Sequence, residues 1–233
     1  MKIGIMQPYF FPYIGYWQLI NAVDKFVIYD DVNFIKNGWI NRNYILLNGQ
    51  KHLITLPLQR VSSFQQINNI DIICNQKIKD KLLKTIYTAY SKANYFKQVF
   101  PIIENTINHE SGNIATAIKY SIQAIVSYLN IQTEILLSSN IKKDISLKGE
   151  NKVINIIKQT GGNEYINAIG GQNLYNRESF LDNGISLYFI HTNENINYAQ
   201  FRNNFVPNLS IIDIIMFNSV KDVKELLNDY ELL

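Results

Sequence analysis

The chain holds a single cysteine among its 233 residues, which excludes an intramolecular disulfide and disfavours a metal centre built from cysteine ligands. That cysteine, Cys74, ends the apolar run IDIIC, and this setting predicts a buried, unreactive thiol rather than a catalytic one. Proline and glycine are sparse as well, at 5 and 11 residues. No stretch is rich enough in them to mark a linker between domains.

Long apolar runs are also missing. No run of about 18 apolar residues occurs, so a membrane span is not expected. Only a few weakly apolar residues separate Lys2 from Gln7, which is too short for the apolar core of a secretory signal. We therefore expect a cytoplasmic protein.

The chain has little excess charge of either sign. Its 22 basic residues face 19 acidic ones, which gives a net charge of +3. We expect this small excess to be spread evenly, without the basic face that binds the phosphates of nucleic acid, so nucleic acid is not expected as a partner. Hydrophobic residues make up 47% of the chain and charged residues 18%, which is typical of a globular protein and not of a disordered one.

Common catalytic motifs are absent too. The sequence has no P-loop, GxGxxG, GxSxG, HExxH or HxxxH, so it identifies no cofactor and predicts no metal site. Its three histidines lie apart in the sequence. His52 follows a predicted turn and His109 lies between predicted helices, whereas His191 ends the predicted strand ISLYFIH. His191 is therefore the histidine best placed for catalysis.

The amino-terminal residues predict one βαβ unit. Residues 2–6 form an isoleucine-rich run that ends at Gln7-Pro8, which is typical of a buried strand. From Tyr13 to about Asp24 apolar residues recur at three- and four-residue steps, which predicts a helix, and KFVIYDDV then predicts a second strand. Parallel strands in such a unit end at one edge of the sheet, where open α/β sheets bind ligands.

The middle of the chain departs from this alternation. YILL and QKHLITLPL flank Asn48-Gly49, the preferred pair for a type I′ turn, so we expect a β-hairpin insert. Apolar stripes then predict two helices, over residues 77–96 and 113–129, joined around Pro101. They define a candidate helical subdomain at about residues 77–130.

Strands and helices alternate again beyond residue 129. The predicted strands are TEILLSS, EYINAIGG and ISLYFIH, and the predicted helices are KGENKVINIIKQTG and LYNRESFLDNG. LSIIDIIMF predicts a helix capped by Ser210, and a last helix is expected over residues 220–232. We therefore predict a single α/β domain over residues 1–233, with a mostly parallel, Rossmann-like sheet flanked by helices.

Asp30 and Asp31 end the second predicted strand, at the edge where the Gln7–Pro12 loop also arrives. A carboxylate there suits a general base, and Asp30 and Asp31 are candidate catalytic residues together with His191. Neighbouring strand residues point to opposite faces, so at most one of the two is expected to line a given pocket. The alternative is a structural pair with Lys36 or Arg42, and the pattern does not separate the two interpretations.

A compact polar group surrounds Trp39 in the run KNGWINRN. Lysine and arginine suit recognition of phosphate or carboxylate, and an exposed indole offers a stacking face for a sugar or base. The alternative is a solvated loop around a core tryptophan. The candidate substrate-binding residues of the whole segment are Gln7, Tyr9, Tyr16, Lys36, Trp39, Asn41, Arg42 and Asn43.

These stretches carry a family resemblance. The runs MQPYFFPYIGYWQLI, YDDVNFIKNGWINRN, ITLPL, LLSS and LSIIDIIMF closely resemble the WbqC-like family of bacteria, over nearly the whole chain. That family is associated with gene sets for O-antigen, lipopolysaccharide, capsule and other surface glycans.

The resemblance implies a transferase that attaches an acyl or aminoacyl group, such as glycyl, to the amino group of a nucleotide-linked amino sugar. Its partners would be that sugar and an acyl donor, which could be a thioester carrier, and an oligomer is allowed. Two alternatives stay open: a non-catalytic nucleotide-sugar-binding or scaffold protein, and a nucleotidyltransferase.

Overall fold

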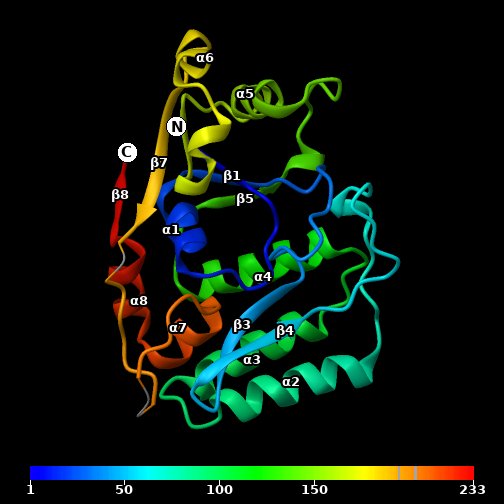
Figure 1. Cartoon of the computed structure of the whole chain (residues 1–233), viewed down its shortest axis with the longest axis vertical. Coiled ribbons are helices and arrows are strands. Elements are labelled where there is room, and N and C mark those ends of the chain that lie inside the picture. Colours follow the sequence, from blue (N-terminus) through cyan, green and yellow to red (C-terminus); the bar gives the residue numbers. More distant parts are fainter. Residues whose placement is uncertain (194, 202–203) are drawn as a thin grey trace.

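The computed structural model describes residues 1–193, 195–201 and 204–233. Its main sheet has six strands in the order β5-β2-β1-β6-β7-β8 (Figure 1). Their bounds are β1 (Lys2–Met6), β2 (Lys25–Ile28), β5 (Glu134–Leu137), β6 (Glu164–Ala168), β7 (Ser186–Thr192) and β8 (Tyr230–Leu232). Neighbouring strands run parallel, except that β8 pairs antiparallel with β7. The predicted mostly parallel α/β sheet is confirmed.

The predicted hairpin is confirmed as a separate two-stranded sheet of β3 (Arg42–Leu47) and β4 (Gln50–Thr55). Asn48 and Gly49 at its turn have φ angles of 52° and 75°. Positive φ at both central residues defines a type I′ turn, and asparagine and glycine adopt it at the least cost. Strand β3 packs against two helices, α2 (Gln76–Tyr90) and α7 (Ile211–Phe217).

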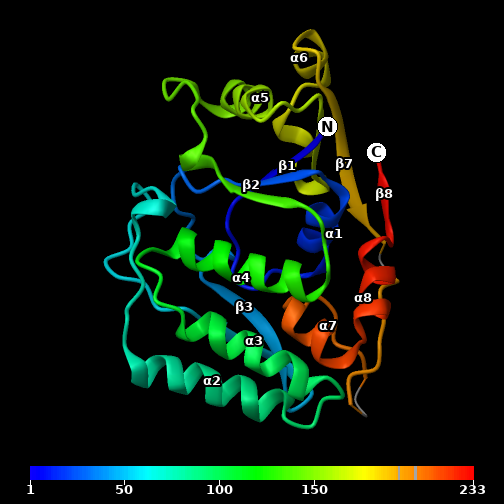
Figure 2. The ribbon, with the colours of Figure 1, turned by 180° about the vertical axis from the view of Figure 1, so that it is seen from behind.

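Helices cover both faces of the main sheet (Figures 1 and 2). The remaining ones are α1 (Ile14–Ala22), α3 (Phe96–Asn108), α4 (Ile114–Tyr128), α5 (Gly149–Gln159), α6 (Arg177–Asp182) and α8 (Val220–Leu227). There are also three short 3-10 helices, η1 (Ile67–Asn69), η2 (Ser138–Asn140) and η3 (Ile169–Leu174). One hydrophobic cluster joins α5 and α6 to one face of the sheet, and a larger cluster joins α1, α4, α7 and α8 to the other.

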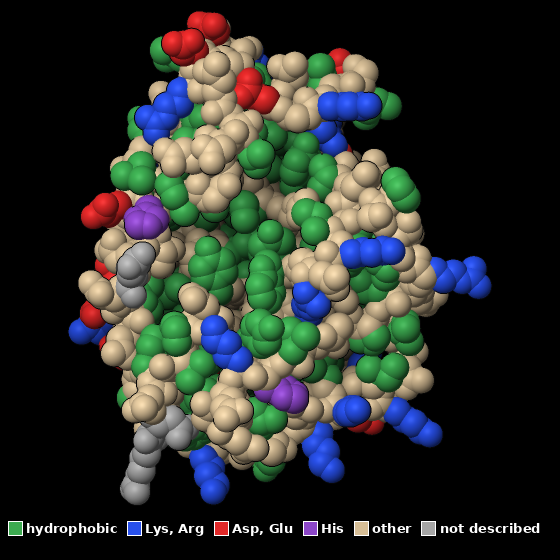
Figure 3. Space-filling view, viewed as in Figure 1, with side chains coloured by type: hydrophobic (Ala, Val, Ile, Leu, Met, Phe, Trp, Pro, Cys, Tyr) green, Lys and Arg blue, Asp and Glu red, His purple; other side chains and the backbone are tan. Residues whose placement is uncertain are grey.

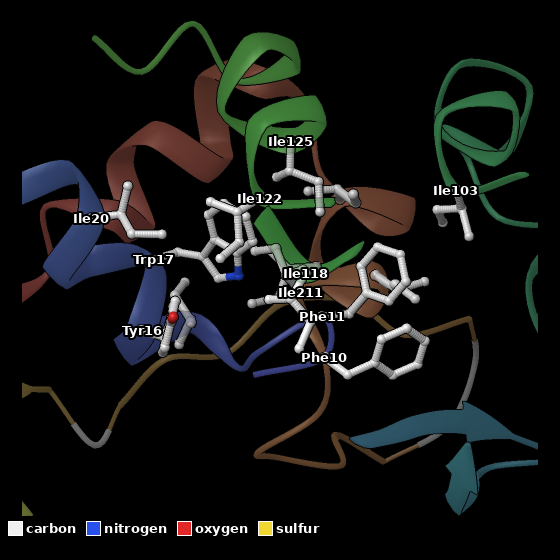
Figure 4. Packing of buried hydrophobic residues seen from close by; sticks show 14 of the residues in the cluster. Phe10, Phe11, Tyr16, Trp17, Ile20, Ile103, Ile118, Ile122, Ile125 and Ile211 are labelled. Carbon is white, nitrogen blue, oxygen red and sulfur yellow. The ribbon is translucent and has the colours of Figure 1, made fainter. Parts of the chain in front are cut away.

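Trp17 of α1 lies at the centre of the larger cluster. Figure 4 shows its indole among isoleucines of α4, with Phe10, Phe11 and Ile211 close by. The side chain is fully buried, and its ring N–H donates to the Pro12 carbonyl at 3.1 Å. The core therefore anchors the end of the loop that precedes α1.

The two predicted helices are present as α2 and α4, but the link predicted around Pro101 is itself the helix α3. Pro101 lies inside α3, between the buried side chains of Val99 and Ile103. Proline removes one backbone hydrogen bond from a helix interior. Burial of the apolar stripe of α3 against α2 and α4 stabilises the helix despite that loss.

Two further predictions near chain ends and turns are wrong. The helix expected over residues 220–232 stops at Leu227, and Tyr230–Leu232 form the edge strand β8 instead. A three-residue strand is too short to show a periodic signal in the sequence. Cys74 is exposed rather than buried, because the bridged stretch ends at Ile72 and Cys74 lies in the connection just before the helix cap Asn75.

The larger cluster combines side chains of the main sheet, the hairpin and helices α1 to α4. The division of the chain into one domain with a helical subdomain at about residues 77–130 stays a prediction. Within the described ranges, no helix is both long enough and apolar enough to cross a membrane.

Candidate functional site

The order of strands turns around between β1 and β6. From β1 the chain winds to β2 and β5 on one side, and it later enters β6 on the other. The carboxyl ends of the strands form a ligand-binding crevice at such a point. A cavity of about 700 Å³ lies there, which we call the first compartment. Its walls include Met6, Tyr9, Tyr13, Gly15, Trp39, Ala168, Gly170, His191, Thr192, Asn193, Tyr198, Phe205 and Asn208.

A second cavity of about 340 Å³, the second compartment, adjoins the first beside the hairpin. The two share Tyr9, Tyr13, Trp39 and Asn208 in their walls, so they form one cleft. The second compartment is completed by Pro12, Asn43, Tyr44 and Lys51. In Figure 3 apolar side chains gather in the hollow at the centre of this face. A cleft lined by rings with a few polar groups is typical of a small-molecule site.

Side chains from three elements hold the loop that forms one wall of the cleft. The Tyr16 hydroxyl of α1 donates to the Gln7 carbonyl at 2.9 Å. The Asn43 amide of β3 donates to the carbonyls of Phe10 and Phe11 at 3.1 and 2.8 Å, and the Ser210 hydroxyl donates to the Phe11 carbonyl at 2.8 Å. Phe11 adopts a left-handed φ of 42°, which these bonds stabilise. The loop is thus pre-organised before a ligand arrives.

Replacing Asn43 by alanine is expected to lower the free energy of unfolding by about 2 kcal/mol, because the Phe10 carbonyl would lose its side-chain donor and the Phe11 carbonyl would keep only Ser210. Chemical denaturation measures this change. Asn41→Ala serves as the control, since Asn41 is half-buried and donates only to the Leu56 carbonyl. Equal stability of the two variants would show that the Asn43 contacts do not hold the loop.

Gly15 is required where α1 enters the cleft. A Cβ atom on this residue would lie 2.7 Å from the Thr192 hydroxyl and 2.7 Å from the Tyr13 ring, well inside contact distance. Glycine therefore lets the first turn of α1 approach β7.

Two tyrosine hydroxyls in the cleft walls have raised pKa values. Burial raises the pKa of the Tyr13 hydroxyl, and it also raises that of Tyr9. Both hydroxyls stay protonated at neutral pH and can donate hydrogen bonds to a ligand.

Asp30 does not line either compartment and instead joins β2 to the turn after β5. Its side chain is 1% exposed, and its two oxygens accept hydrogen bonds from the Ser139 amide at 2.9 Å and the Ser139 hydroxyl at 2.6 Å. These bonds connect two neighbouring carboxyl ends of the sheet. The catalytic role of Asp30 stays a prediction, and its contacts are those of a structural link.

Asp31 likewise lies outside the cleft walls, in a cluster with two lysines. Its carboxylate is 3.0 Å from Lys143 and 3.0 Å from Lys152, and both lysine side chains are largely buried. Lys152 also donates to the Asp31 carbonyl and lies over the Tyr29 ring. The partners are not Lys36 or Arg42, which were the expected structural partners. The catalytic role of Asp31 stays a prediction.

The polar group around Trp39 divides into structural and cleft-facing members. The Arg42 guanidinium donates to the carbonyls of Gly38 and Asn37, and so closes the loop that carries Trp39. Asn41 binds the Leu56 carbonyl, and Lys36 is exposed away from both compartments. Lys36 and Arg42 are therefore not brought together at the cleft to bind a phosphate or carboxylate, and their binding roles stay predictions.

Four predicted site residues do lie along the cleft. Tyr9 and Trp39 line both compartments, Asn43 lines the second, and His191 lines the first at the end of β7. Gln7 and Tyr16 do not line the cleft, but the hydrogen bond between the Tyr16 hydroxyl and the Gln7 carbonyl helps to hold the loop that does. The strand-end position that singled out His191 in the sequence also brings it to the cavity, since carboxyl ends of parallel strands share one edge.

Sequence reasoning missed Asp213, which lies behind the first compartment. It is fully buried in α7 and accepts hydrogen bonds from the Tyr90 hydroxyl at 2.8 Å, the Tyr198 hydroxyl at 2.7 Å and the Gln200 amide at 2.6 Å. Gln200 also binds both backbone groups of Val206. The network therefore ties the cavity wall around Tyr198 to the helical layer. One acidic residue inside the apolar run LSIIDIIMF was the available signal.

Within the described part of the chain, no three His, Cys, Asp or Glu side chains come close enough together to hold a metal ion. From the residues that the structure describes, the cleft offers aromatic rings, hydroxyls, carboxamides, one imidazole and one ammonium group.

Comparisons with known proteins agree with the sequence resemblance. The model of the WbqC-like protein family matches residues 7–225. An uncharacterized protein of Mycobacterium tuberculosis (strain ATCC 25618 / H37Rv), Rv1507c, is 25% identical over 215 residues, which cover 92% of each chain. No solved structure gives a significant match. The chain belongs to the WbqC-like protein family.

Proposed function

We propose that the protein is a transferase that attaches an acyl or aminoacyl group, such as glycyl, to the amino group of a nucleotide-linked amino sugar in surface polysaccharide biosynthesis. The observation that carries the proposal is the two-compartment cleft at the switch point of the sheet. Two connected cavities suit two substrates that must meet, and the shared walls of Tyr9, Tyr13 and Trp39 suit sugar or base rings.

His191 is the proposed proton acceptor in place of Asp30 or Asp31, because it is the member of that set that lines the cleft. The sugar amine attacks the carbonyl carbon of the donor, so that a C–N bond forms and the bond to the leaving group breaks. The imidazole takes the proton from the amine and returns it to the leaving group. Backbone N–H groups at the start of α1, beside Gly15, are near enough to the first compartment to stabilise the developing oxyanion.

A panel of nucleotide-linked amino sugars incubated with acyl and aminoacyl donors tests the proposal, with mass spectrometry of the sugar product. His191→Ala is expected to lower kcat by about a hundredfold or more, the usual contribution of a general base, while calorimetry still detects the sugar. His52→Ala on the hairpin is the control, because His52 lines neither compartment.

Full turnover in His191→Ala would remove this residue from the mechanism. Sugar binding without any product would favour the non-catalytic binding protein, and release of pyrophosphate would favour nucleotidyl transfer.

A further inference from the structure

Charge is unevenly divided along the chain, so the expected even spread is wrong. Residues 32–100 contain ten Lys and Arg residues but only two Asp and Glu, a net charge of +8. The rest of the chain contains twelve basic and seventeen acidic residues, a net charge of −5. The net charge of +3 hides this division because the two parts offset each other.

The basic segment includes the hairpin and α2, and most of its charged side chains face solvent. Helix α2 buries Leu82, Leu83 and Ile86, so Lys77, Lys81 and Lys84 lie exposed on its other side. Figure 3 shows Lys and Arg side chains gathered over the lower part of the face that holds the cleft, where Figure 1 places the hairpin and α2. We call this surface the basic face. Among the described residues, none of the ion pairs involves residues 32–100.

Apolar side chains lie exposed in the same segment. Leu53 of β4 and Ile78 and Tyr87 of α2 are 39%, 36% and 52% exposed, and Phe64 is 89% exposed. Nucleic-acid backbones are bound chiefly by charge and hydrogen bonds, whereas protein interfaces combine basic and aromatic side chains with apolar anchors. The mixture favours a protein with an acidic surface over a nucleic acid.

Lys51 connects the basic face to the cleft. It belongs to β4, and its side chain lines the second compartment together with Tyr44 and Trp39. Its ammonium group makes no hydrogen bond or ion pair with any described residue. An ammonium beside an apolar compartment suits a ligand that carries a phosphate at its outer end and a less polar arm inside.

We propose that an acidic carrier protein docks on the basic face and delivers the acyl group on a phosphate-linked arm through the second compartment. This rests on the proposed transfer reaction and names its donor: the leaving group is the thiol of the arm. The thioester C–S bond breaks as the C–N bond to the sugar forms, and the proton released by the amine goes to the thiolate. The sugar then occupies the first compartment.

Binding of an acidic acyl carrier protein tests the proposal, in the form without its arm and in the form that carries 4′-phosphopantetheine. The affinity should fall as salt rises, and the form with the arm should bind more tightly. Lys77→Glu/Lys84→Glu should weaken both forms about tenfold, since like charges then face each other. Lys51→Met should remove the difference between the two forms and leave the form without the arm nearly unaffected.

Lys142→Glu/Lys148→Glu is the matched control, because these exposed lysines precede α5 outside the basic face. Thermal melting confirms that each variant is folded. Absence of binding, an equal effect of the control pair, or tighter binding of a DNA oligonucleotide of equal charge would overturn the proposal. If product forms from a free thioester but no carrier binds, the carrier proposal is wrong and the transferase proposal holds. If the carrier binds but no product forms, the transferase proposal is wrong and docking of the carrier holds.

Discussion

Replacing Asp31 by alanine is expected to lower the free energy of unfolding by about 3 kcal/mol. The substitution leaves the ammonium groups of Lys143 and Lys152 without the carboxylate that lies 3.0 Å from each. Their side chains are only 3% and 13% exposed, so water cannot fully replace the lost partner. Two unpaired cations in one buried place also repel each other. Urea denaturation at neutral pH measures the loss.

The same cluster gives a defined pH dependence. Burial raises the pKa of Asp31, but the ion pairs with Lys143 and Lys152 outweigh burial and hold the pKa below its ordinary value. A carboxyl with a lowered pKa in the folded state stabilises the protein above its unfolded pKa, and that stability is lost as pH falls through the folded pKa. We expect Asp31→Asn to flatten the fall in stability below about pH 4.

Lys152→Met is the control for the structural role of Asp31. It leaves Asp31 paired with Lys143 and should therefore cost less than Asp31→Ala. If Asp31→Ala instead keeps the wild-type stability but loses turnover in the transfer assay, Asp31 belongs to the catalytic machinery as the sequence predicted.

Replacing Asp213 by alanine is expected to lower the free energy of unfolding by about 4 kcal/mol, because the buried donors Tyr90 and Gln200 and the half-buried Tyr198 lose their acceptor at once. The damage should extend to the cleft. Tyr198 lines the first compartment and donates to Asp213, and Gln200 links the same carboxylate to Val206. Weaker sugar binding in the folded fraction is thus expected along with the lower stability, and calorimetry measures it.

Tyr198→Phe is the conservative control, since it removes one donor and leaves the ring in place. It should cost about 1 kcal/mol. Burial raises the pKa of Asp213, although the bonds from Tyr198, Tyr90 and Gln200 lower it in part. The change of stability with pH is therefore opposite to that of Asp31. A carboxyl with a raised pKa in the folded state gives stability that is present below the unfolded pKa and is lost as pH rises through the folded pKa. Asp213→Ala with unchanged stability would exclude the network as a support of the cleft wall.

Much of the fold follows from local patterns. The isoleucine run of β1, the stripe of α1 and the Asn48-Gly49 turn each lie where the sequence places them, because strand alternation, helical periodicity and turn conformation are properties of neighbouring residues. Helix α3 and strand β8 escaped prediction for the converse reason. Helix α3 contains a proline and β8 has only three residues, so neither shows a clear local pattern. Packing against distant elements decides the conformation of both.

The candidate site divides along the same line. The sequence by itself determined that a polar, aromatic stretch would stand at the carboxyl edge of a parallel sheet, and it singled out Tyr9, Trp39 and His191, which line the cleft. Only the tertiary structure decided that Asp30 and Asp31 turn toward Ser139 and two lysines, and that Asp213 supports the wall. The partners of a buried charge come from segments far apart in the sequence, and those partners decide whether the loss of hydration is offset.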